Sequence, residues 1–191
     1  MARIEDGSGR GFATAVDSTN RLLTESVSLS VAEEAVLNGV RFEIGAAITL
    51  TGTAETAVLY LENLQNEDLI IDRFEFGCDE STGGTSEAMN LKLYTGPTGI
   101  TNGTAIQSVN GNFGSALVLN ADIEFGNGST SAVTGGSQFG SSYIRFVGQS
   151  TFDGPWALPR GTSFALTATP PASNTSLPFT VRVLTHLERS E

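Results

Sequence analysis

Cysteine, histidine and lysine are nearly absent from this sequence. The single cysteine, Cys78, excludes an intrachain disulfide, and the single histidine, His186, excludes a histidine-based metal cluster. Lys92 is the only lysine, so arginine supplies the rest of the 10 basic residues. Arginine suits bidentate, partly buried ion pairs, which favours a role for some of these side chains in interfaces. A compositional bias of the source genome is the alternative explanation.

Long apolar runs are also missing. No run approaches the roughly 18 residues that indicate a membrane-spanning helix, so we expect no membrane partner. No apolar segment follows the charged residues at the start of the sequence, so we expect no secretory signal peptide. The protein is therefore expected to be made in a reducing cytoplasm, and to stay there unless something larger carries it out.

Positive charge is scarce as well. The 10 basic residues stand against 21 acidic ones, which leaves a formal net charge of −11. Binding to a phosphate backbone needs a basic surface, so we expect no nucleic-acid partner. A strongly acidic chain is kept soluble by mutual repulsion between its copies.

The Gly-rich stretch Asp6–Asp17, DGSGRGFATAVD, has the length and some ligand positions of an EF-hand calcium loop. The match fails because Arg10 stands where an oxygen ligand belongs, and because Asp17 replaces the bidentate glutamate. The same stretch lacks the preceding strand and the Lys-Ser/Thr pair of a phosphate-binding loop. We therefore predict neither a metal nor a cofactor.

No group of residues forms a convincing catalytic set. His186 lies in LTHLERSE and is expected at the surface, and Cys78 is expected to be a structural or partly buried thiol. The sequence lacks the aromatic platforms of a glycosidase cleft, and Trp156 is expected to fill a corner of the fold. We predict that the protein is not an enzyme. The carboxylates considered for a glycosidase are Glu75, Asp79, Glu80, Asp122 and Glu124.

Residues that favour strands and turns are abundant. With 22 Gly and many Thr, Val, Ile and Phe, the 191 residues predict one all-β domain. Short alternating segments recur at the spacing of an antiparallel, jelly-roll-like β-sandwich with about nine or ten strands. The sequons that begin at Asn102, Asn127 and Asn174 are interpreted as turns. The main predicted strands are 25–37, 40–52, 55–64, 67–77, 88–96, 142–148, 155–161, 162–170 and 177–188.

Two of these segments carry more specific expectations. Segment 25–37 is predicted as the first strand, and a helical turn that stops at Asn38-Gly39 is the alternative. Segments 55–64 and 67–77 give the strongest hairpin signal, because a short and mostly polar connection joins two apolar runs.

The chain is expected to consist of an extended arm and a body. Residues 1–24 are polar and Gly-rich, and they are predicted to be a docking arm; residues 25–191 are predicted to form the sandwich. Within the body, the biased region 101–142 is expected to form long surface hairpins at one end. An arm that cannot bury its apolar residues alone would bury them against a partner. The residues expected to bind that partner are Ile4, Arg10, Phe12, Val16, Arg21 and Leu22.

Three stretches taken together resemble a family of structural virion proteins of tailed bacteriophages. They are IEDGSGRGFATAVDSTNRL (4–22), AVLNGVRFEIGAAITLTG (35–52) and AVLYLENLQNEDLIIDRFEF (57–76). The resemblance covers about the first 80 residues, from Ile4 to Phe76, and fades in the Gly-rich middle. It implies a β-sandwich or jelly-roll body, frequent assembly as trimers, and a role in head decoration or a related structural position.

On this resemblance, the expected function is that of a capsid decoration, or cement, protein that binds and stabilises the head. Its expected partners are the major capsid protein or another virion protein, and further copies of itself in a homotrimer. Its expected location is the capsid surface of the virion, after assembly in the host cytoplasm. The alternatives are a structural protein of the tail, neck or fibre and, in another class, a carbohydrate-binding module or depolymerase.

Overall fold

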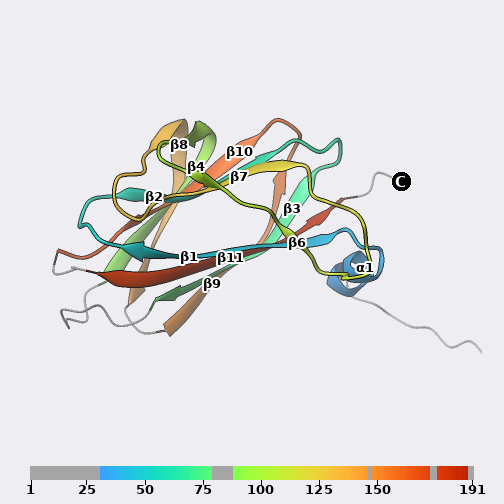
Figure 1. Ribbon diagram of the computed structural model, residues 1–191, viewed down its shortest axis with the longest axis horizontal. Helices are drawn as coiled ribbons and strands as arrows, with labels where there is room; N and C mark the ends of the chain where they lie inside the picture. Colours follow the sequence, from blue (N-terminus) through green and yellow to red (C-terminus); the bar gives the residue numbers. More distant parts are fainter. Residues whose placement is uncertain (1–30, 79–87, 146–147, 173–175, 189–191) are drawn as a thin grey trace, which may run out of the picture. The chain divides into compact units, whose positions relative to one another are not determined.

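The structure, a computed structural model, describes residues 31–78, 88–145, 148–172 and 176–188. The chain divides into two units, Met1–Val31 and Ala32–Glu191, and the description below concerns the second unit together with Val31. This unit is an antiparallel β-sandwich with one short helix among its described residues, so the predicted fold class is confirmed (Figure 1).

The sandwich consists of two sheets. The first has the strand order β6-β1-β11-β3-β9, and the second has the order β5-β7-β2-β10-β4-β8. The strands of the first sheet are β1 (Arg41–Leu50), β3 (Leu69–Cys78), β6 (Val109–Asn110), β9 (Gly148–Leu158) and β11 (Leu177–Leu187). Those of the second sheet are β2 (Thr56–Asn63), β4 (Ala88–Ile100), β5 (Thr104–Ala105), β7 (Ala121–Phe125), β8 (Val133–Arg145) and β10 (Ser163–Thr169).

The strand order is that of a jelly roll with an insertion. Without β5, β6 and β7, the sheets read β1-β11-β3-β9 and β2-β10-β4-β8, which is the order of an eight-stranded jelly roll. The residues between β4 and β8 add β6 to the outer side of β1, and they add β7 and β5 to the outer side of β2. The insertion therefore extends both sheets on the same side of the sandwich.

The predicted hairpin between segments 55–64 and 67–77 is wrong. Strand β2 pairs with β7 and β10, whereas β3 pairs with β11 and β9 in the other sheet. The short connection crosses between the sheets, and the buried side chain of Asn63 holds it there. Its amide donates to the carbonyls of Glu67 (2.9 Å) and Leu158 (2.8 Å), and its oxygen accepts from the Gln65 N–H (2.9 Å).

The predicted strand 25–37 is also wrong over its described part, because Val31–Leu37 is the helix α1. Glu33 and Glu34 lie in its first turn, where carboxylates favour a helix. The helix stops at Asn38-Gly39, as the alternative interpretation predicts. Gly39 has φ +68°, and its N–H donates to the carbonyl of Val36 (3.0 Å). Residues 25–30 lie outside the described residues.

The Gly-rich region 101–142 contributes more than surface hairpins, contrary to the prediction. It contains β5, β6, β7 and most of β8, and the side chains of Leu119, Ile123 and Phe125 belong to the core. Strand β7 lies between β2 and β5 and covers what would otherwise be the edge of the second sheet. Composition suggested a surface region because glycine and polar residues dominate here, yet these three apolar side chains reach buried positions.

The core lies between the two sheets and is rich in phenylalanine. Phe74 of the first sheet makes an edge-to-face contact with Phe164 of the second, with ring centroids 5.2 Å apart. Within the first sheet, Phe76 stacks on Phe74 at 6.1 Å and on Phe179 at 6.2 Å. Aromatic pairs of this kind stabilise a core beyond the area that they bury.

Candidate docking surface

Large exposed hydrophobic side chains gather at one end of the sandwich. Of the eight that are exposed among the described residues, six come from α1, the connection between β2 and β3, and the segment 109–118. Phe113 is 94% exposed and Leu37 is 66% exposed. We call this the α1-end surface, and it comprises Leu37, Leu64, Val109, Phe113, Leu117 and Val118.

Hydrogen bonds connect the three segments that carry these residues. The Asn112 amide donates to the carbonyl of Leu37 (3.4 Å), and the Asn110 amide donates to that of Leu117 (3.0 Å). The Leu64 N–H donates to the carbonyl of Asn120 (3.1 Å). The three segments therefore adjoin one another at this end of the sandwich.

Local turns hold Phe113 away from the core. The Asn110 side-chain oxygen accepts from the Asn112 N–H (2.8 Å), and the Asn112 side-chain oxygen accepts from the Gly114 N–H (3.0 Å). Asparagine forms such turns readily because its short side chain reaches the backbone two residues on. The sequence NGNFGS thus presents an aromatic ring at the tip of a polar turn, where it is almost fully exposed.

The same end is acidic. The connections at this end carry five carboxylates and one arginine among their described residues, and the Arg160 guanidinium donates to the Asn66 side-chain oxygen (2.8 Å). A hydrophobic centre with a charged surround is the usual anatomy of a protein interface. The carboxylates favour a partner with basic groups. They are Glu33, Glu34, Glu67, Asp68 and Glu188.

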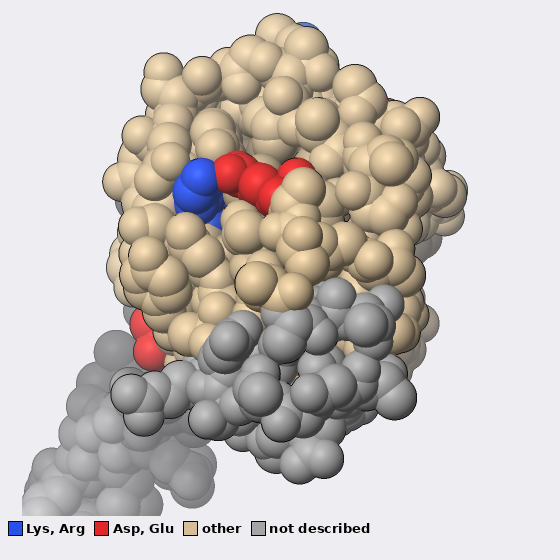
Figure 2. All heavy atoms as spheres, turned by 90° about the vertical axis from the view of Figure 1, so that its left-hand side faces the viewer, with Lys and Arg blue, Asp and Glu red and all other residues tan. Residues whose placement is uncertain are grey.

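The opposite end has another character. Its described connections, 51–55, 126–132 and 170–172, contain one charged residue, Glu55. In the part of this end that is not covered by grey atoms, Figure 2 shows few charged side chains, most of them in one small group of both signs. Glu55 accepts from Tyr94 (2.8 Å) and Thr167 (2.8 Å) and pairs with Lys92. Burial raises the pKa of Glu55, but these three donors outweigh it and leave the pKa below its usual range.

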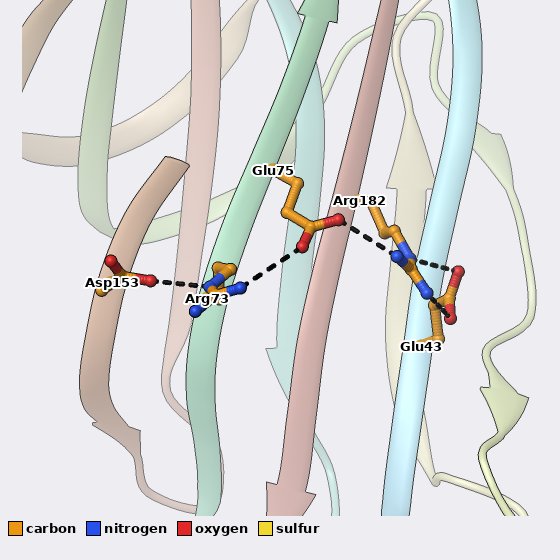
Figure 3. Close-up of polar contacts among 5 residues, drawn as sticks. All are labelled: Glu43, Arg73, Glu75, Asp153 and Arg182. Atoms are coloured by element: carbon orange, nitrogen blue, oxygen red, sulfur yellow. Dashed lines mark hydrogen bonds and ion pairs between the residues drawn. The ribbon is translucent and has the colours of Figure 1, made fainter. Parts of the chain in front are cut away.

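The outer face of the first sheet carries a row of ion pairs across four strands (Figure 3). Arg182 on β11 binds Glu43 on β1 through two bonds of 2.6 Å, and it binds Glu75 on β3 at 3.1 Å. Arg73 lies 3.8 Å from Glu75 and 2.6 Å from Asp153 on β9. These arginines are thus occupied within the chain rather than in an interface.

The ion pairs of this row shift the pKa values of Glu43 and Arg182 in the directions that keep both groups ionised. The hydrogen bonds from Arg182 hold the pKa of Glu43 below its usual range, although partial burial opposes them. The bonds to Glu43 in turn raise the pKa of Arg182. Because every charge of this row has a partner on its own sheet, the row stabilises the sheet more than it offers a binding site.

Other residues singled out by the sequence are placed as follows. The prediction that His186 is a surface residue is wrong, because its side chain is only 12% exposed and its Nδ1 lies 3.0 Å from Asp72. The prediction for Cys78 is confirmed, since its side chain is buried. Trp156 packs against Phe74 at 5.4 Å. Glu75 belongs to the row of ion pairs, and Asp122 and Glu124 lie on β7.

The predicted partner-binding residues lie outside the described residues. The same holds for Asp6–Asp17, the stretch compared with a calcium loop, for the carboxylates Asp79 and Glu80, and for the sequon at Asn174. The other two sequons are in turns, as predicted: Asn102 has φ 52°, and the Asn127 side-chain oxygen accepts from the N–H groups of Ser129 and Thr130. The partner-binding residues concerned are Ile4, Arg10, Phe12, Val16, Arg21 and Leu22.

Sequence reasoning missed the α1-end surface. A usable signal was present in NGNFGS, because an aromatic residue between turn-forming residues has little chance of reaching a core. The remaining members gave no signal, since Leu64 and Leu117 become exposed only through the way in which the connections cross the end of the sandwich.

Comparison with known proteins finds no matching family model and no matching curated protein. Within residues 31–78, 88–145, 148–172 and 176–188, no group of three or more His, Cys, Asp or Glu side chains is arranged to hold a metal ion. The helical part of the described chain offers nothing long and apolar enough to span a membrane.

Proposed function

We propose that this protein is a structural component of a tailed-bacteriophage virion, located on the capsid surface, where it acts as a decoration or cement protein. Its partner is the major capsid protein or another virion protein. In this role it carries out no reaction, holds no cofactor, and needs neither nucleic acid nor membrane. The resemblance of residues 4–76 to such proteins motivates the proposal.

The observation that carries the proposal is the concentration of exposed apolar side chains on the α1-end surface. Several large apolar side chains exposed on adjoining segments of an acidic protein favour an interaction site. The N-terminal segment joins the body at Val31, where α1 begins, so the proposed docking arm is covalently continuous with this end. Arm and surface together would give several weak contacts for each copy, which multiply when copies are linked.

We propose that the copies are linked as homotrimers. The formal charge of −11 on each copy opposes assembly, and salt screens this repulsion over about 8 Å at physiological ionic strength. The trimer is therefore expected to tighten as salt is raised from low values. Light scattering at several salt concentrations measures this, and a mass near 20 kDa at every salt concentration would refute self-assembly.

Deleting residues 1–24 tests the role of the arm. We expect the circular dichroism and the melting temperature of the body to stay nearly unchanged, and attachment to purified heads to be lost. A deletion variant that unfolds would show instead that this segment is an integral part of the fold. The number of copies per particle then separates a head protein, present in hundreds, from a tail, neck or fibre protein.

Point variants test the α1-end surface separately. Phe113→Ser and Val118→Ser are expected to weaken attachment roughly tenfold or more when combined, because both side chains are exposed and available for burial. Ala47→Ser is the control, since Ala47 is exposed but lies on β1, outside the α1-end surface. Equal losses for the pair and for the control would remove the α1-end surface from the proposal.

The chemical part of the proposal has its own test. His186→Ala and Cys78→Ala are expected to change no biological function beyond effects on stability, since one side chain is bound to Asp72 and the other is buried. A variant that stays folded but loses an activity would contradict the non-enzymatic role. A glycan-binding role gains no support from Trp156, whose ring packs on Phe74.

A further inference from the structure

The sandwich has an apolar pocket at the edge formed by β8 and β9. These strands end their sheets in the described part of the chain, and they lie on the side opposite the insertion. The pocket lies between the sheets and has a volume of about 220 Å³. The described residues that line it are all uncharged, and its walls are mainly Phe74, Leu93, Phe139, Trp156, Leu158 and Phe164.

The chemistry of the walls favours an aromatic occupant. Phe74 already contacts both Trp156 and Phe164, and Phe139 is 54% exposed at the edge. Aromatic rings gain from offset or edge-to-face contacts with other rings. An apolar cavity of about 150 Å³ is enough to bind benzene, so a pocket of this volume accommodates one ring.

The strands beside the pocket favour an occupant with an extended backbone. The outer sides of β8 and β9 have no neighbouring strand among the described residues. An extended segment that is added to such an edge gains main-chain hydrogen bonds, while a pocket next to the edge selects one side chain. From Val133 to Tyr143, β8 has no Asp, Glu, Lys, Arg or Pro, the residues that usually block such pairing.

We propose that the pocket binds Phe12 from the N-terminal segment of a second copy of this chain. Phe12 is the sole aromatic residue in positions 1–30, and its neighbours Gly11 and Ala13 allow the backbone to approach closely. Phe12, Thr14 and Val16 alternate, so an extended backbone directs them to one side.

Length and charge agree with an exchange between copies. Phe12 lies 19 positions before Val31, a stretch that reaches up to about 60 Å when extended. Between positions 7 and 16 the segment carries one charge, that of Arg10, which favours contact with an acidic neighbour. A head-to-tail exchange of arms also closes a ring of copies, as the proposed trimer requires.

Trp156 provides a direct test, because it is the only tryptophan of the chain and lines the pocket. The variant lacking residues 1–24 is mixed with a synthetic peptide of residues 8–18, while Trp156 emission and its quenching by acrylamide are recorded. We expect saturable protection of Trp156. The same peptide with Phe12→Ser is expected to bind roughly tenfold more weakly or worse, because the aromatic ring supplies most of the buried area.

Two surface variants identify the site. In the truncated protein, Phe139→Ser is expected to weaken binding of the peptide. Phe113→Ser, on the α1-end surface, is expected to leave binding of the peptide unchanged. Both side chains are exposed, so both variants keep the core intact. Equal binding of the two peptides, or no response of Trp156 to either, would overturn the proposal.

The full chain identifies the source of the segment. On dilution of the full chain, we expect the protection of Trp156 from acrylamide and the oligomeric mass to fall together. The full-chain variant Phe12→Ser is expected to show neither the protection nor the oligomer. If Trp156 stays protected in monomers, the pocket binds the N-terminal segment of the same copy, and the proposed exchange between copies is wrong. Concentration-dependent protection in the truncated protein would assign it to another surface of the second copy. This test extends the proposed self-association but uses no virion, so its failure is distinct from failure of the decoration role.

Discussion

On one edge of the sandwich, the residues between β4 and β8 add short strands to both sheets, whereas the other edge ends in the long strands β8 and β9. At the first edge, Phe125 of β7 is 3% exposed and belongs to the core. At the second edge, Phe139 of β8 is half exposed beside an apolar pocket. Both phenylalanines belong to the same Gly-rich region of the sequence.

The difference shows that an insertion can cover one edge of a jelly roll with additional strands while the other edge stays open to pairing with a partner. Strands at the edge of a sheet present unpaired backbone groups, which proteins usually cover, charge or interrupt. Here the covered edge is expected to contribute to stability, and the edge at β8 and β9 is expected to contribute to association. Variants that separate stability from association therefore test the comparison.

The largest effect is expected from the two phenylalanines. Phe125→Ala should lower the free energy of unfolding by about 3–5 kcal/mol, because it leaves a cavity in the core. Phe139→Ala should lower it by less than about 1 kcal/mol, since the side chain is already half exposed. Urea unfolding followed by circular dichroism measures both, and similar losses would mean that the two edges are equally part of the core.

A smaller effect is expected where the insertion turns back from β7 toward β8. The Asn127 side-chain oxygen accepts backbone N–H groups from Ser129, Thr130 and Ser131 at 2.9–3.2 Å. Asn127→Ala should cost about 1–2 kcal/mol, because these donors lose their partner. Gln138→Ala, on exposed β8, is the control and should cost less than about 0.5 kcal/mol. A neutral Asn127→Ala would show that water replaces the side chain.

The row of ion pairs runs from β9 at one edge to β1 next to the other, and it allows a pH test. Arg182→Met should cost about 1 kcal/mol or less near pH 7, since its pairs are partly exposed. Because the pKa of Glu43 is lowered in the folded state, the stabilisation is present above the unfolded pKa, near 4.3, and is lost as pH falls through the lowered value.

The difference in stability between wild type and Arg182→Met should therefore shrink below about pH 4. Arg73→Met serves as the comparison at the edge formed by β9. Arg73→Met should lower the melting temperature less than Arg182→Met does. Arg73 donates one short hydrogen bond, to Asp153, whereas Arg182 donates two short hydrogen bonds to Glu43. Melting temperatures recorded from pH 3 to pH 7 would decide, and a pH-independent difference would exclude the Glu43 pair as its source.

The smallest effect on stability is expected from a charge placed on β8. Ser137→Lys should change the free energy of unfolding by less than about 0.5 kcal/mol, because Ser137 is exposed and lies opposite the uncharged Thr95. It should nevertheless weaken self-association, since lysine on an edge strand opposes the pairing of further strands. Analytical ultracentrifugation compares it with wild type. Unchanged association would exclude the outer side of β8 from the contact between copies.

Single strands were more predictable than their partners. The alternation of Met89, Leu91 and Leu93 is enough to predict a buried face on β4, and all three side chains are buried. The helical alternative at α1 was also visible, because Asn38-Gly39 is a local stop signal. The candidate surface was largely hidden, since exposure of Leu37 and Leu117 depends on connections that meet only in the folded chain.

Composition and alternation by themselves determined that this chain is an acidic, all-β protein without an intrachain disulfide, because these properties depend on residue types and on a period of two. Only the tertiary structure decided that β2 and β3 lie in different sheets, that the Gly-rich region closes one edge, and that His186 is paired with Asp72. Each of these rests on hydrogen bonds between residues far apart in sequence. Their free energy depends on which strands become neighbours, and no local pattern encodes that choice.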